Sequence, residues 1–324
     1  MRAYIATIAV FFVTFVGDNA LAQDFKPTRP IEVVVQSASG GGTAVFARLI
    51  AGILEKEKLL SQPVQVVNNS RAAVPWAMAT LAERKGDGHT LGIFTDAWVA
   101  TPLLREDAKY TVKDLTPLAH LLLQPSIVLV KADCPYATLK DFIDAAKKSP
   151  VRLKQAGGPA QAIETQQGFL IQRATGAKWD ILSIPKKPAK IADLLSGNTQ
   201  IIIQEPSHVS DELKSGSLRA LVALTERRIS SLPDLSTARE QGVDIPFLAN
   251  GRGIMAPPGL SKEAIEYWEE LFSRMVKTPS WRKYLEDTRV EPYFLKSRDF
   301  ARLLDEQNAL MRSNLQEAGA KLVR

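Results

Sequence analysis

The sequence predicts an α/β protein of two domains, each built on a mainly parallel sheet flanked by helices. The chain has 324 residues, a length typical of two domains. Short runs rich in β-branched residues alternate with stretches whose apolar residues recur at helical spacing, which is typical of βαβ units. This pattern occurs near the N-terminus and again in the middle of the chain, so we expect one sheet in each domain.

The first half of the pattern begins with a predicted strand at 31–35. A glycine-rich turn follows it and opens a helix whose apolar face includes Phe46 and Ile50. Two further strands are expected at 64–67 and 90–94, separated by a helix that ends near Arg84.

The middle of the chain repeats the alternation. Thr138 is the expected N-cap of a helix, with Asp141 completing a variant of the capping box, and a second helix is expected at 165–174. The strands of this part are predicted at 126–130, 153–156, 201–203 and 218–224. From Ser261 onward the sequence indicates helices interrupted at Pro279 and Pro292.

Two crossings between the domains are expected, near Gln124-Pro125 and Thr225-Glu226. They divide the chain into a discontinuous domain 1 (23–124 and 226–324) and a central domain 2 (125–225), which has a typical domain size. Two crossings are what a protein needs to close its lobes about a hinge.

The first 22 residues have the features of a cleaved signal peptide. Arg2 precedes an apolar run, and Ala20-Leu21-Ala22 matches the small-x-small pattern, so we expect cleavage after Ala22 and a periplasmic mature protein. The alternative is a membrane anchor, but the apolar run is shorter than the ~20 residues that span a bilayer. The single cysteine, Cys134, is expected to be a small buried hydrophobe.

Charge and motif content argue against several functions. The net charge of +6 comes from scattered basic residues, which does not indicate nucleic-acid binding. The three histidines are isolated, and no spacing resembles a metal site or a nucleophile elbow. Glu164 and Glu205 are a conceivable carboxylate pair, but a solvated or structural role is the better interpretation. We therefore expect no catalytic residues, no metal and no cofactor.

Two glycine-containing loops are the candidate binding elements. In the first, the amides of Gly42, Thr43 and Ala44 and the Thr43 hydroxyl could hold a carboxylate or phosphate at a helix N-terminus. The alternative is a plain strand-to-helix turn with Thr43 as N-cap. The second loop begins at Gly157-Gly158 in the central domain, and Lys186 or Lys187 could add a counter-charge. Loops of this kind from two domains could face each other across a cleft.

Motifs along the whole mature chain resemble the substrate-binding receptors of tripartite tricarboxylate transporters, often called Bug-type receptors. The matching segments, in order, are Gly40 to Thr43 with Ala47-Arg48, Gln62-Pro63-Val64, Asp87 to Leu91, Leu218 to Leu221, Arg227-Arg228, Leu232-Pro233-Asp234 and Gly253 to Pro257. The resemblance implies a two-lobed periplasmic binding protein of type II, a Venus-flytrap receptor. Its ligands would be small carboxylates, held largely by main-chain amides, hydroxyls and water.

From this resemblance we expect ligand-binding residues from both lobes. Trp98 follows a predicted strand end, so it is a further, weaker candidate for the pocket wall. The expected set is Ser39, Gly41, Gly42, Thr43, Ala44, Asn69, Ser70, Ala73, Thr95, Gly158, Ala160, Gln161, Pro185, Lys186 and Gln204. Several positions depart from the family pattern, among them Ala44 for an acidic residue, Ala160 for glycine, Gln161 for serine, Glu164 for histidine and Gln204 for aspartate. These departures leave the identity of the ligand open.

The expected function is capture of a small carboxylate-type ligand for uptake by membrane permease subunits of a tripartite transporter, by a monomer that is not an enzyme. One alternative is a receptor of the same fold that signals to a membrane sensor. Another is an enzyme, for example a transferase that uses the first glycine loop for a phosphate. The absence of a recognisable base, nucleophile or metal cluster in the sequence counts against the enzyme.

Overall fold

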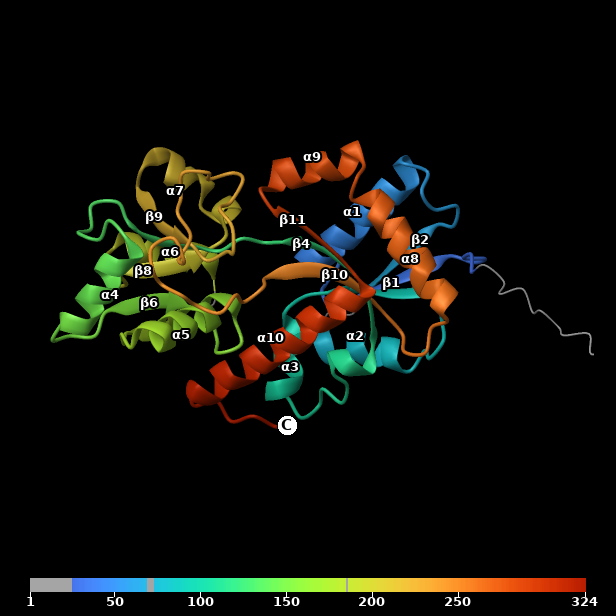
Figure 1. Cartoon of the computed structure of the whole chain (residues 1–324), viewed down its shortest axis with the longest axis horizontal. Helices are drawn as coiled ribbons and strands as arrows, with labels where there is room; N and C mark the ends of the chain where they lie inside the picture. The colour runs from blue at the N-terminus through green and yellow to red at the C-terminus, as the bar shows by residue number, and fades with distance from the viewer. Residues whose placement is uncertain (1–24, 69–72, 185) are drawn as a thin grey trace, which may run out of the picture.

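The computed structural model describes residues 25–68, 73–184 and 186–324. The chain forms two lobes, each built around one sheet with helices on its faces (Figure 1). The predicted two-lobed α/β architecture is confirmed. The expected signal peptide at 1–22 lies outside the described residues, and no helix within the described ranges is long and apolar enough to cross a membrane.

Lobe 1 contains a six-stranded sheet in the order β11-β4-β10-β3-β1-β2. Its strands are β1 (Ile31–Val35), β2 (Val64–Asn68), β3 (Thr90–Phe94), β4 (Thr116–Leu123), β10 (Gly251–Ala256) and β11 (Glu291–Lys296). Its helices are α1 (Gly42–Lys56), α2 (Ala73–Ala82), α3 (Ala97–Leu104), α8 (Lys262–Met275), α9 (Pro279–Thr288) and α10 (Ser297–Glu317), with a short 3₁₀ turn at Val112–Asp114.

Lobe 2 contains a five-stranded sheet in the order β7-β6-β8-β5-β9. Its strands are β5 (Ile127–Lys131), β6 (Lys154–Gly157), β7 (Asp180–Ser183), β8 (Ile201–Gln204) and β9 (Leu218–Ala223). Its helices are α4 (Leu139–Lys148), α5 (Ile163–Thr175), α6 (Lys187–Leu195) and α7 (Ser210–Ser215), with a 3₁₀ turn at Pro206–His208. Thr138 caps α4 and forms the predicted capping box with Asp141.

The strand pairing is mixed, which differs from the mainly parallel sheets predicted. In lobe 1, β1 pairs in parallel with β2 and β3, whereas β10 runs antiparallel to β3 and β4. In lobe 2, β6 is parallel to β7 and β8, whereas β5 is antiparallel to β8 and β9. The sequence pattern indicated the βαβ units. The strands next to the crossings between the lobes, β5 and β10, are antiparallel to the strands of these units.

The helices of the tail are interrupted at Pro279 and Pro292, as predicted, but the interruption at Pro292 is a strand, β11, which was not predicted. Pro279 begins α9 after α8 has ended at Met275, which suits the fixed φ of proline at the first helical position. Pro292 lies within β11, a strand at the edge of the lobe 1 sheet, where a missing N–H is tolerated.

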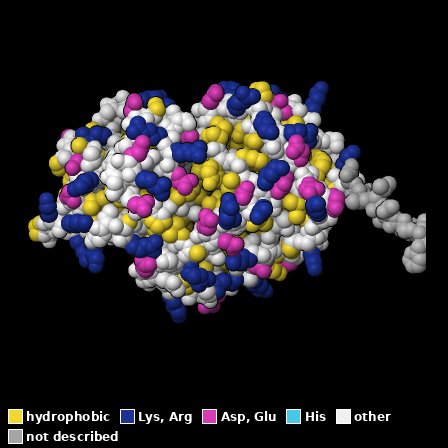
Figure 2. Space-filling view, in the orientation of Figure 1, with side chains coloured by type: hydrophobic (Ala, Val, Ile, Leu, Met, Phe, Trp, Pro, Cys, Tyr) yellow, Lys and Arg dark blue, Asp and Glu magenta, His cyan; other side chains and the backbone are white. Residues whose placement is uncertain are grey.

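Each lobe has an apolar core on both faces of its sheet. In lobe 1, α1, α8 and α9 cover one face, and α2, α3 and α10 cover the other. On the face shown in Figure 2, hydrophobic side chains gather along the junction between the lobes, and Lys and Arg side chains are spread over both lobes.

Two chain segments meet at the crossing between the lobes. The Gln124 amide N–H donates to the Asn250 carbonyl at 2.7 Å, which joins the outgoing and returning segments. The residues after Thr225 still pack on lobe 2, because Ala238 and Val243 are buried in its core and Thr237 bridges to Ala223. We therefore propose that the chain returns to lobe 1 after Pro246, later in the sequence than the expected crossing at Thr225-Glu226.

Helix α10 connects the two lobes. It starts on the lobe 1 sheet and runs toward α5 of lobe 2 (Figure 1). Near its end, the buried Asn314 amide donates to Gln166 Oε1 at 2.6 Å and to the Gln166 carbonyl at 2.9 Å. Leu170 of α5 packs in the same apolar cluster as Met311 and Leu315.

Candidate functional site

The N-terminus of α1 presents three backbone N–H groups without partners among the described residues. Gly41 is the N-cap and makes no side-chain cap, and the first amide of the helix with an acceptor is that of Val45, which donates to the Gly41 carbonyl at 3.0 Å. The amides of Gly42, Thr43 and Ala44 are therefore left open, as at any uncapped helix start. Such a terminus favours an anion, since the free N–H groups and the helix dipole both carry positive charge.

The loop before α1 is held in place by contacts among strand ends. The Thr43 hydroxyl donates to Ser37 Oγ at 2.6 Å, so Thr43 fixes the loop rather than acting as the N-cap considered from the sequence. Asn68 Nδ2 donates to the Ser37 carbonyl at 3.1 Å, and Gln36 is within 3.1 Å of Thr95 Oγ1. These bonds tie the carboxyl ends of β1, β2 and β3 together, where ligands of open α/β sheets bind.

The predicted residues of this loop differ in how they face solvent. Gly42 and Ser39 are exposed, and a Cβ at Gly42 would meet no atom within 4 Å. A Cβ at Gly41 would lie 2.6 Å from that of Ser37, so only glycine fits there. Ala44 is fully buried in the core below α1, so only its backbone can take part in binding. Thr95 is buried at the end of β3.

The second glycine loop, in lobe 2, is largely satisfied by its own residues. The Gly158 amide donates to Thr165 Oγ1 at 2.9 Å, and the Ala160 carbonyl accepts from Gln166 Nε2 at 2.5 Å. Ala160 and Gln161 are exposed. A Cβ added at Gly158 would lie 2.8 Å from Glu164 Oε1, so the loop already carries a carboxylate.

Glu164 forms a buried ion pair with Lys190 of α6. The Nζ to Oε1 distance is 2.5 Å, and the side chains are only 6% and 14% exposed. This contact confirms the structural role expected for Glu164. It also means that the positive charge of Lys190 is already neutralised within lobe 2.

The remaining predicted residues lie at the ends of elements in both lobes. Lys186 is exposed and is the N-cap of α6, and Gln204 is buried at the end of β8. Ala73 begins α2. Asn69, Ser70 and Pro185 lie outside the described residues.

A charged cluster that the sequence did not reveal lies at the junction of the lobes. Glu205 accepts from Gln124 Nε2 at 2.9 Å, and His208 Nε2 is 3.6 Å from the same carboxylate. Lys187 Nζ lies 2.7 Å from His208 Nε2. Burial lowers the pKa of both Lys187 and His208, and the nearby Glu205 carboxylate opposes this shift.

Asp96 and Arg252 face this cluster from lobe 1. The Gly251 amide donates to Asp96 Oδ1 at 3.2 Å. Burial raises the pKa of Asp96 to about 7, although the positive charge of Arg252 opposes the shift. These residues are far apart in the sequence and follow no motif, so their grouping depends on β10 pairing with β3.

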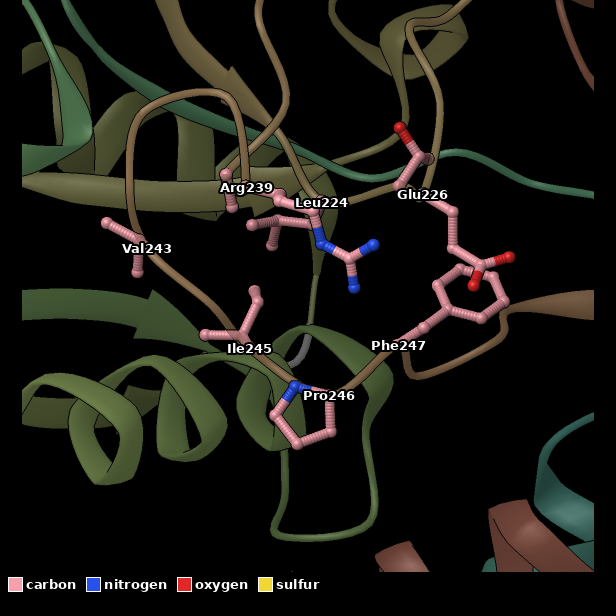
Figure 3. A pocket seen from close by; sticks show the side chains of 9 residues that line it. Leu224, Glu226, Arg239, Val243, Ile245, Pro246 and Phe247 are labelled. Atoms are coloured by element: carbon pink, nitrogen blue, oxygen red, sulfur yellow. The ribbon is translucent and has the colours of Figure 1, made fainter.

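Trp98 is a core residue and does not line the cleft. It is fully buried against Leu81 and the β3 backbone at Gly92, which corrects the minor chance given to it as a pocket residue. A small hollow at the return crossing is not a ligand site either. Figure 3 shows Ile245 and Pro246 facing Leu224 across it, and its volume of about 30 Å³ has room for a water molecule or two.

The comparison with protein families identifies the group to which this arrangement belongs. The model of the tripartite tricarboxylate transporter family receptor, TctC, matches residues 46–319. The chain belongs to the TctC receptor family. Members of this family are binding proteins, and the resemblance drawn from the sequence motifs is confirmed.

Individual TctC relatives agree with this assignment. A UPF0065 protein of Bordetella bronchiseptica is 28% identical over 299 residues, covering 91% of this chain and 87% of its own length. A TctC solute-binding protein from Polaromonas has a TM-score of 0.81 at 24% identity, covering 90% of this chain and 99% of its own. The R. palustris protein Rpa4515, solved with adipate, has a TM-score of 0.70 at 24% identity, covering 90% of this chain and 98% of its own.

Proposed function

We propose that this chain is a periplasmic receptor that captures a small carboxylate between its lobes for uptake by a tripartite transporter. The observation that carries the proposal is the row of three open amides at the N-terminus of α1, the first of which belongs to the exposed Gly42. The adipate bound to a protein of the same fold supports a carboxylate ligand. This function requires no bond making or breaking, so the proposal includes no enzymatic activity.

Mass spectrometry of the natively purified protein tests this function. We expect a small organic acid to co-purify with the wild type in about molar ratio and to be depleted from Gly42→Val. Gly52→Val is the matched control, because Gly52 is an exposed glycine of the same helix with open space around its Cβ position. A neutral or cationic molecule as the retained ligand would contradict the proposal.

The periplasmic location has a separate test. The Ala20-Leu21-Ala22 pattern predicts that the exported protein begins at Gln23. N-terminal sequencing of protein from the periplasmic fraction should find Gln23 as its first residue. An intact Met1 on the mature protein would contradict export through this signal.

A further inference from the structure

Lys187 and Lys190 of α6 are engaged with protein groups, and Lys186 before them is exposed to solvent. Lys190 is buried in its ion pair with Glu164, and Lys187 Nζ lies between the two ring nitrogens of His208 at 3.0 and 2.7 Å. The carboxylate of Glu164 stands beside Gly158, so the lobe 2 loop is a poor place for a second anion. Recognition of negative charge is therefore expected to come mainly from lobe 1.

Arg252 lies on lobe 1 at the point where the strand ends meet. β10 runs antiparallel to β3, and Gly253 pairs with Phe94 at the end of the ladder. Arg252 and Thr95 are the next residues beyond this last pair. Thr95 contacts Gln36 at the end of β1, close to the loop that leads into α1.

The guanidinium of Arg252 has no hydrogen bond or ion pair within the part of the chain that the structure describes. It is half-buried and carries five N–H donors in a fork that suits a carboxylate. The neighbouring acids are engaged, because Glu205 accepts from Gln124 and Asn250, and Asp96 accepts from the Gly251 amide. Burial also raises the pKa of Asp96 to about 7, which weakens it as a partner for arginine near neutral pH.

We propose that Arg252 binds the carboxylate of the ligand and sets the preference of the cleft for an anion over its neutral amide. The inference rests on the proposed function and adds a cationic residue from the returning strand to the open amides of α1. A lysine at this position would retain the positive charge but could not make two parallel hydrogen bonds to a carboxylate. Arg252→Lys should therefore retain only part of the affinity.

Calorimetric titration with malate, adipate, hexanoate and benzoate tests this role in Arg252→Gln and Arg252→Lys. For the probe that the wild type binds best, we expect Arg252→Gln to lose roughly tenfold or more in affinity, as for a hydrogen bond to a charged group. Arg252→Lys should recover part of the loss. The dependence of affinity on salt should be weaker in Arg252→Gln than in the wild type. The affinity for the carboxylate divided by the affinity for the corresponding neutral amide should also be lower in Arg252→Gln than in the wild type. The control is Arg298→Gln on the exposed start of α10, which should leave all of these values unchanged.

The outcomes separate this inference from the proposed function. Wild-type affinity and salt dependence in Arg252→Gln, together with lost binding in Gly42→Val, would overturn the role of Arg252 and leave the receptor function intact. Failure of the wild type to bind any of the four carboxylates would contradict the proposed function and this inference with it. Circular dichroism and thermal unfolding of each variant establish that a loss of affinity reflects the site and not the fold.

Discussion

At the scale of single residues, the candidate site depends on hydrogen-bond donors that have no partner among the described residues. Gly42 exposes the backbone at the start of α1, whereas the hydroxyl of Thr43 is used by Ser37 to hold the loop. Arg252 is half-buried with no protein partner among the described residues. The site is therefore defined by unsatisfied donors, which is what an anion requires.

His120 makes the stability of the fold depend on pH. It is 1% exposed among Phe94, Tyr293 and Phe300, and burial lowers its pKa from 6.5 to about 4. His120 is therefore protonated at a higher pH in the unfolded chain than in the native protein. The stabilisation that the native state gains from a neutral His120 is complete above pH 6.5. About 3 kcal/mol of it is lost as the pH falls toward 4.

Urea unfolding at several pH values tests the effect of His120. His120→Gln should show a smaller loss of unfolding free energy than the wild type between pH 7 and 4.5. Equal pH dependence in His120→Gln and the wild type would show that His120 does not titrate in this window.

At the scale of elements, the sequence predicted the parts that are locally encoded. The capping box of α4 and the bounds of β1 and β3 follow from residues close together in the chain. β4, β10 and β11 were not predicted, because Pro117, Gly251 and Pro292 interrupt the strand patterns there. Their stability comes from pairing with each other, which no local pattern reveals.

Only part of the candidate site is encoded by residues close together in the chain. The open amides at 42–44 follow from a strand, a glycine run and a helix in immediate succession. The partners of Glu164 and the surroundings of Arg252 come from elements that are distant in sequence, α6 and β3. The sequence could therefore indicate the candidate anion-binding loop but not the charges around it.

The contact between α10 and α5 should stabilise the arrangement of the two lobes. Asn314→Ala would leave the buried Oε1 of Gln166 without its donor, which costs about 1–3 kcal/mol. We expect urea unfolding to show this loss. Gln316→Ala, at an exposed position of the same helix, should change the unfolding free energy by less than about 0.5 kcal/mol. Equal stabilities for the two variants would show that the Asn314 contact contributes nothing.

At the scale of the whole molecule, two lobes joined by paired crossings suit closure about a hinge. The crossings meet at Gln124 and Asn250, and Glu205 of lobe 2 accepts from the side chains of both. Ligand binding should therefore draw the lobes together. Small-angle scattering should show a smaller radius of gyration at saturating carboxylate, whereas an unchanged radius would argue against closure.

Whether the open amides of α1 hold the carboxylate can be decided by calorimetric titration of Gly42→Val beside Gly52→Val. A Cβ at position 42 meets no protein atom within 4 Å, so the variant should fold, but its side chain would stand where the ligand approaches the amides. We predict that Gly42→Val loses roughly tenfold or more in affinity for the carboxylate that the wild type binds, with Gly52→Val unchanged. Wild-type affinity in a folded Gly42→Val would contradict this placement of the ligand.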